Sequence, residues 1–228
     1  MRKSVHHVVT RMQQPDYGLP VLLGLIILMA FVLPSLGLEG DNERLYSDVA
    51  STLMVVSGLV VVSGERRVFI VTAVIVLATA LVRWTAWLYP PGALGAWPAF
   101  AGAIVVLTFS CVILWQVVRP GDVTLSRVLG AIAVYLLLGI GWAYAYQVAE
   151  HVFPGSFTGT TAQTIALSDW MYFSFVTLTT VGYGDMAPVH RVARALATGE
   201  ALTGQLYIAV LLARLVSLEV STRHRPGA

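Results

Sequence analysis

The chain has 228 residues, of which 57% are hydrophobic and 11% charged, and its formal net charge is +2. Such a composition is too apolar for a soluble domain of this length, and the small net charge gives no support to a nucleic-acid partner. The single cysteine, Cys111, excludes an intrachain disulfide and a cysteine-based metal cluster. We therefore expect an integral membrane protein.

Six near-continuous apolar runs reach or approach the length of about 20 residues that a helix needs to cross the hydrocarbon core. They lack the alternation that a transmembrane β-strand would show. The first run follows a tail without a small-residue cleavage site, so we interpret it as a true span rather than a signal peptide. The expected spans are residues 19–38, 47–63, 68–89, 97–118, 127–150 and 189–218, of which the second is short.

The basic residues indicate how these spans are oriented. Loops rich in Arg and Lys lie in the cytoplasm, and here such residues precede the first span, follow the last and occupy alternate loops. Both termini are therefore expected in the cytoplasm, with Trp84, Trp87, Tyr89 and Trp97 at the outer interface of a cell membrane. A single lysine among 14 basic residues favours a prokaryotic source. The residues that define the pattern are Arg2, Lys3, Arg11, Arg66, Arg67, Arg119, Arg127, Arg223 and Arg225.

Between the fifth and sixth spans, the sequence predicts a turret and a helix that is too short to cross. Residues 152–167 are uncharged and rich in Gly, Thr, Ser and Pro, which is typical of an extracellular loop. Ser168 is the expected N-cap of a helix over 169–179, with the Asp169 carboxylate near the positive end of the helix dipole. At 1.5 Å per residue this helix is about 16 Å long, half of the hydrocarbon thickness. We therefore expect it to end at membrane depth and to return the chain through an irregular segment.

That irregular segment is the run Thr179-Thr180-Val181-Gly182-Tyr183-Gly184-Asp185. An extended segment whose carbonyls all face one axis alternates ordinary and left-handed backbone angles, and glycine enters the left-handed region without steric cost. Gly182 and Gly184 meet this requirement at alternate positions. From geometry alone, such a segment binds either an anion through its amides or a cation through its carbonyls.

The motif resembles the selectivity filter of the tetrameric potassium channel family, and the similarity to that family's pore module extends over residues 122–218. The resemblance implies an outer helix, turret, pore helix, filter and inner helix, with K⁺ as the permeant ion and no organic cofactor. Because each chain carries one filter segment, it also implies a homotetramer. K⁺ would be held by the carbonyls of residues 180–183 and the Thr180 hydroxyl. The implied ion-binding residues are Thr180, Val181, Gly182, Tyr183 and Gly184.

The resemblance also implies residues that support the filter. Asp185 matches the aspartate that ties the filter to the pore helix, and Tyr172 matches its aromatic partner. Thr179 precedes the ion-binding residues and completes this supporting set. Val176 is apolar where some family members carry a glutamate that is hydrogen-bonded to the aspartate, which removes that partner.

The sixth span carries the expected gate and cavity residues. Gly204 lies where the family often has a gating hinge, and a glycine that permits close helix packing is the alternative. Gln205, Ile208 and Leu212 follow at helical spacing and are candidates to line the inner cavity. Glu200 either attracts cations near the cavity or forms a structural hydrogen bond to a neighbouring helix, for instance to Tyr or Ser groups of the fifth span. We slightly favour the second alternative.

The first four spans occupy the position of a voltage sensor but lack its charges. Residues 97–118 contain no charged side chain, whereas a sensor carries arginine at every third position. Arg83 stands alone in the third span, where we expect it to snorkel beside Trp84 and Trp87. We therefore predict little or no voltage sensing through an arginine ladder.

The predicted fold is all-α, with six transmembrane helices, a re-entrant pore helix and a filter loop, assembled as a homotetramer in the lipid bilayer. The expected parts are a cytoplasmic tail over 1–18, a four-helix bundle over 19–121, the pore module over 122–218 and a cytoplasmic tail over 219–228. The predicted function is passive conduction of K⁺ across the cell membrane, with no enzyme activity, nucleic-acid partner or soluble ligand. The alternatives are a potassium transporter subunit, a pore subunit that requires partner proteins, and a membrane enzyme based on Glu200, His151 and His190.

Overall fold

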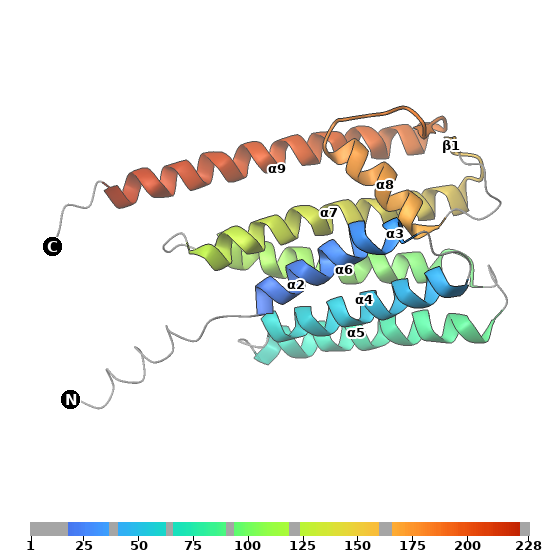
Figure 1. Cartoon of the computed structure of the whole chain (residues 1–228), viewed down its shortest axis with the longest axis horizontal. Helices are drawn as coiled ribbons and strands as arrows, with labels where there is room; N and C mark the ends of the chain where they lie inside the picture. The colour runs from blue at the N-terminus through green and yellow to red at the C-terminus, as the bar shows by residue number, and fades with distance from the viewer. Residues whose placement is uncertain are drawn as a thin grey trace.

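The computed structural model of the chain describes residues 18–36, 41–62, 66–89, 94–118, 124–159 and 166–223. Long helices run side by side through most of this part, and the short helix α8 lies obliquely beside α7 and α9 (Figure 1). The expected cytoplasmic tails and the centre of the expected turret lie largely outside the described residues. The elements are α2 (Gly18–Ile27), η2 (Leu28–Val32), α3 (Leu33–Ser35), α4 (Asp41–Val62), α5 (Arg66–Thr85), η3 (Ala86–Leu88), α6 (Trp97–Val118), α7 (Leu125–Val152), β1 (Phe157–Thr158), α8 (Leu167–Leu178), β2 (Ala187–Pro188) and α9 (Arg191–Arg223).

Within the described residues, four helical segments are long and apolar enough to cross a membrane. They are Gly18–Ser35, Arg66–Leu88, Trp97–Val118 and Leu125–Val152, and they coincide with four of the expected spans. The expected spans over 47–63 and 189–218 are helices α4 and α9. In α4 only the shorter stretch Asp48–Leu59 is apolar, because the helix begins in a charged segment. The chain is thus a helical membrane protein, and the count of six spans stays a prediction.

The N-terminal helices pack against the fifth expected span, α7. Helix α6 lies along α7, α2 contacts both α4 and α7, and α5 packs on α6. Large apolar side chains fill this core, and the van der Waals contacts between them hold the helices of the bundle together. The largest fully buried apolar side chains include Leu22, Ile26, Phe109, Ile113, Leu137 and Ile140.

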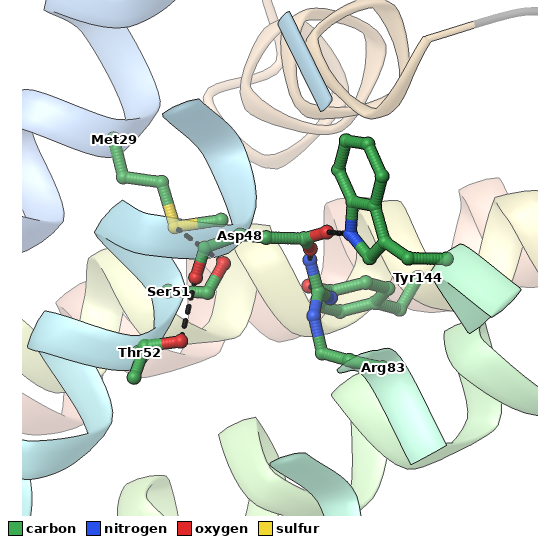
Figure 2. A network of polar contacts seen from close by, with 7 residues as sticks. Met29, Asp48, Ser51, Thr52, Arg83 and Tyr144 are labelled. Atoms are coloured by element: carbon green, nitrogen blue, oxygen red, sulfur yellow. Dashed lines mark hydrogen bonds and ion pairs between the residues drawn. The ribbon is translucent and has the colours of Figure 1, made fainter. Parts of the chain in front are cut away.

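Arg83 forms a largely buried ion pair, so the expectation that it stands alone and snorkels beside Trp84 and Trp87 is wrong. Its guanidinium pairs with the Asp48 carboxylate of α4 and donates a hydrogen bond of 2.9 Å to the Tyr144 hydroxyl of α7 (Figure 2). The Trp87 indole N–H donates to the other carboxylate oxygen of Asp48 at 3.0 Å. A charge removed from water requires such partners, and this network joins α4 and α5 to α7.

The segment after α7 folds back onto the chain beyond the filter motif. Strand β1 pairs antiparallel with β2, and Phe157 lies opposite Pro188. The amides of Val189 and His190 donate to the Ser156 carbonyl at 2.8 and 3.2 Å. The described part of the expected turret is therefore ordered by pairing with the chain that leads into α9, which the sequence pattern did not indicate.

Candidate functional site

Helix α8 is the expected half-length helix, and it begins earlier than predicted. Its N-cap is Ala166, so the assignment of Ser168 as N-cap is wrong by two residues. Asp169 lies in the first turn as expected, and its carboxylate accepts the backbone N–H of Ala166 at 3.2 Å. This carboxylate satisfies a donor that the start of a helix leaves free, and it lies at the positive end of the dipole. The helix has 12 residues and ends at Leu178, directly before the motif.

The chain leaves α8 through a run of amides that bond back to the helix. Thr180 donates to the Thr177 carbonyl at 2.9 Å, and Val181 and Gly182 donate to the Val176 carbonyl at 2.9 and 3.2 Å. Thr179 caps the turn, and its hydroxyl donates to the Phe175 carbonyl at 2.6 Å. These amides are therefore occupied, which disfavours the alternative in which the segment binds an anion through its N–H groups.

The backbone angles of the motif alternate as its sequence predicts. The φ angles of Gly182 and Gly184 are 57° and 80°, so both residues occupy the left-handed region. Thr180 also has a positive φ of 59°, which the sequence analysis missed. A residue with a side chain in that region costs about 1–2 kcal/mol of backbone strain. The two-residue spacing of the glycines was the available signal that the left-handed angles extend back to Thr180. Among the described residues, none donates a hydrogen bond to the carbonyl oxygens of residues 180–184.

Tyr172 and Asp185 are joined by the contact that the sequence predicts. The Tyr172 hydroxyl donates to the Asp185 carboxylate at 2.7 Å, and this hydrogen bond is the main cause that lowers the pKa of Asp185. The Tyr172 ring also stacks on Tyr183 of the motif, with 6.5 Å between centroids and 5° between the planes. The middle of α8 thus holds the C-terminal end of the motif through one polar and one aromatic contact.

The C-terminal end of the motif is also packed against the segment that follows α7, the expected turret. Gly159 has a φ of 84°, and a Cβ placed on it would lie 1.8 Å from the Asp185 carbonyl oxygen, so the approach of the two backbones requires glycine here. The Glu150 carboxylate accepts the amides of Gly155 and Ser156 at 2.7 and 2.9 Å and shapes the turn before β1. Sequence reasoning missed Glu150 and Gly159 because their partners depend on how the turret folds.

Helix α9 passes close behind the end of α8. A Cβ placed on Gly204 would lie 2.2 Å from the Leu178 carbonyl oxygen, so close packing, the alternative to a hinge, is what the geometry supports. The helix runs without interruption from Arg191 to Arg223. The Tyr135 hydroxyl of α7 reaches the same Leu178 carbonyl at 3.5 Å.

The three other cavity candidates of α9 have different surroundings in the structure. The Gln205 amide lies 3.5 Å from the Thr180 hydroxyl, directly below the motif, and Ile208 is 48% exposed in the single chain. Leu212 lies in α9, and its side chain is outside the described residues.

The inclusion of Glu200 among the cavity candidates is wrong, because its side chain is completely buried between helices. It contacts the Tyr146 hydroxyl of α7, as the favoured alternative predicts. Its second partner is the Ser174 hydroxyl, which belongs to α8 rather than to the fifth expected span.

A half-length helix that ends in an extended segment with alternating left-handed angles, followed by a long helix, is the arrangement of a channel pore loop. With the four apolar spans, it defines a helical membrane protein of the channel class.

Comparison with known proteins places the chain within this class. The family model described as "Ion channel" matches residues 128–220. The chain is 35% identical to Protein LctB of Bacillus caldotenax over 126 residues, which are 52% of this chain and 93% of LctB. Protein LctB of Geobacillus stearothermophilus is 32% identical with the same coverage. Residues 128–220 therefore form an ion channel domain, and the chain belongs to the same family as Protein LctB.

The chain is also similar to proteins that are named potassium channels. It is 34% identical over 83 residues to Two pore potassium channel c of Oryza sativa subsp. japonica, which covers 36% of this chain and 17% of that protein. It is 39% identical over 80 residues to the inward rectifier potassium channel Kirbac3.1 of Paramagnetospirillum magnetotacticum, which covers 33% of this chain and 24% of that channel. The chain thus spans less than a quarter of the length of these two relatives. No solved structure matches the chain.

Proposed function

We propose that the chain is a subunit of a potassium-selective channel that passes K⁺ down its gradient. The ion is held by the backbone carbonyls of residues 180–183 and by the Thr180 hydroxyl, which replace its hydration shell. The observation that carries this proposal is the alternation of φ at Thr180, Gly182 and Gly184, together with carbonyl oxygens that no described group occupies. The names of the Oryza and Paramagnetospirillum relatives support K⁺ as the ion.

We propose that four copies assemble around the filter. One chain contributes one filter segment, and a ring of carbonyls around an ion requires several. In the single chain Val181 is 53% and Tyr183 71% exposed, and the outward face of α9 exposes Leu202 and Leu206 at 59% and 62%. Apolar and aromatic groups beside a narrow polar segment are typical of a surface that a second copy covers. A homotetramer supplies that cover and closes the ring.

In the proposed assembly, α4 and α9 also cross the bilayer, which makes six spans with both termini in the cytoplasm. Helix α8 is re-entrant, and its negative end at Leu178 points towards the ion path and favours a cation. Residues 19–121 form the four-helix bundle and residues 122–218 the pore module. The proposed function requires the assembled subunits, a lipid bilayer and K⁺ as the permeant ion.

Flux into liposomes tests the proposal directly. The purified protein is reconstituted without other proteins, and an outward potassium gradient drives the uptake. The protein vesicles are expected to take up rubidium and to exclude sodium, while protein-free vesicles take up neither. Equal entry of sodium and rubidium would contradict the filter assignment. Selective flux that appears only after a second protein is added would favour the alternative of a pore subunit with obligatory partners.

A further inference from the structure

Helices α8 and α9 meet in a regular register behind the proposed filter. Two positions one turn apart on α8, Ser174 and Leu178, face two positions one turn apart on α9, Glu200 and Gly204. Residues four apart lie on the same face of a helix, so these two contacts form a single seam. The lower contact is a close backbone approach, and the upper contact is polar.

The polar contact has three members besides Glu200. One oxygen of its carboxyl group contacts the Tyr146 hydroxyl of α7, and the other contacts the Ser174 hydroxyl. The Ser174 hydroxyl also lies 2.6 Å from the Gly139 carbonyl oxygen of α7. Glu200, Ser174 and Tyr146 are all completely buried. We refer to these residues, with the Gly139 carbonyl, as the Glu200 hub.

The number of hydrogens available to this hub favours a neutral Glu200. Its three oxygen-to-oxygen contacts are short enough that each needs a hydrogen between the two atoms. Tyr146 and Ser174 supply one hydrogen each, and the Gly139 carbonyl supplies none. If the Ser174 hydroxyl donates to Gly139, the hydrogen in its contact with Glu200 must come from the carboxyl group. Each of the three contacts has a hydrogen of its own only when Glu200 is protonated.

The surroundings of the hub agree with this count. Among the described residues the ion pair between Arg83 and Asp48 is the one found, so no described cation balances a charge on Glu200. The groups that face it are Tyr146 and, further away, Tyr135 from α7, with Ser174 from α8. A buried ionised carboxylate without a cation is costly, whereas a neutral carboxyl group needs only hydrogen bonds.

We infer that Glu200 is a positioning residue: as a neutral carboxyl group, it ties the inner helix α9 and the outer helix α7 to the pore helix α8 and so holds the filter in its ion-binding form. The inference rests on the proposed channel function. Val176 cannot brace the filter from behind with a polar side chain, and the Glu200 hub provides a polar brace from the inner helix instead. A displacement of α9 is transmitted through Ser174 to the helix that carries the filter.

The first test measures how potassium stabilises the assembled protein against heat. The measured quantity is the potassium concentration that gives half of the maximal protection. Gln can both donate and accept a hydrogen bond, so this concentration is expected to be the same in Glu200→Gln as in the unsubstituted protein. Glu200→Ala and Ser174→Ala are expected to raise this concentration about tenfold, because each leaves buried partners unsatisfied. Ser57→Ala is the matched control, since the buried Ser57 hydroxyl has no partner among the described residues. Equal damage from Glu200→Gln and Glu200→Ala, or no change in Glu200→Ala, overturns the inference.

The second test reads the proton without reference to ion flux. The infrared spectrum of the reconstituted protein at neutral pH is expected to contain the carbonyl stretch of a protonated carboxyl group that is lost in Glu200→Gln. Absence of that difference band overturns the neutral hub even if the protein is potassium-selective. Conversely, equal flux of sodium and rubidium through the unsubstituted protein rejects the proposed function, while the infrared band still decides the state of Glu200.

Discussion

The proposed filter depends on residues that accept left-handed backbone angles, which gives a paired prediction at residue scale. Gly182 and Gly155 have φ angles of 57° and 78°, and a Cβ on either meets no other atom within 4 Å in the single chain. Alanine therefore adds backbone strain of about 1–2 kcal/mol at both positions. Gly182→Ala is expected to abolish selective rubidium uptake in liposomes, whereas Gly155→Ala, in the outer turn, is expected to retain it. Loss of uptake in both variants would mean that strain alone, rather than filter geometry, explains the effect.

The hydrogen bond between Tyr172 and Asp185 predicts a dependence on pH. It lowers the pKa of Asp185 below its unfolded value, so its stabilising effect is present above that value and is lost as the pH falls through the lowered pKa. Tyr172→Phe removes the largest cause of the shift and leaves the ring that stacks on Tyr183. We expect the acid loss of potassium protection to begin at higher pH in Tyr172→Phe. Single-channel open times should also shorten, and unchanged open times and acid sensitivity would count against this role.

At the scale of elements, the packing of α9 on α8 predicts different results for two glycines of one helix. A methyl group on Gly204 would overlap the Leu178 carbonyl at 2.2 Å, whereas on Gly199 it would lie 3.4 Å from the Trp142 ring. Gly204→Ala is expected to destabilise the protein by about 1–3 kcal/mol through overpacking. Gly199→Ala is expected to be neutral or to stabilise by up to about 1 kcal/mol through helix propensity. Thermal unfolding in detergent measures both, and a stable Gly204→Ala protein that fails to open would favour the hinge instead.

The helices show which elements local sequence can predict. Length and apolarity were sufficient for the helices over 66–88, 97–118 and 125–152. The glycine spacing was sufficient for the left-handed angles of Gly182 and Gly184, but not for that of Thr180. The start of α8 was misplaced because Asp169 accepts the Ala166 amide, which makes a Ser168 cap unnecessary. Strands β1 and β2 have two residues each and exist only because they pair with one another, so neither carries a period of its own.

Over the whole molecule, the contacts that sequence could not predict are those between helices far apart in the chain. Arg83 and Asp48 are 35 residues apart, and Glu200 lies 26 residues beyond Ser174. Whether such side chains meet depends on the rotation and depth of each helix in the bundle, which the apolar pattern leaves open. The polar character of Glu200 was sufficient to predict a buried partner, and the identity of the α8 partner required the packed structure.

The largely buried ion pair of the N-terminal helices leads to a prediction about voltage. Each charge that crosses the field contributes about 2.3 kcal/mol per 100 mV, but Arg83 is held by Asp48 and Tyr144, and α6 carries no charged residue. We expect shallow conductance–voltage curves, and Arg83→Gln should leave their slope unchanged.

The same substitution should destabilise the protein by about 3 kcal/mol, because it leaves the buried Asp48 carboxylate without a cation. Arg66→Gln, at the exposed start of the same helix, is the matched control and should change neither quantity. A steep curve in the unsubstituted protein that becomes shallow in Arg83→Gln would instead make this ion pair a moving sensor. The two measurements on Arg83→Gln distinguish a structural ion pair from a voltage sensor. If the pair is structural, the substitution lowers only the melting temperature, and if it is a sensor, the substitution changes the slope of the conductance–voltage curve.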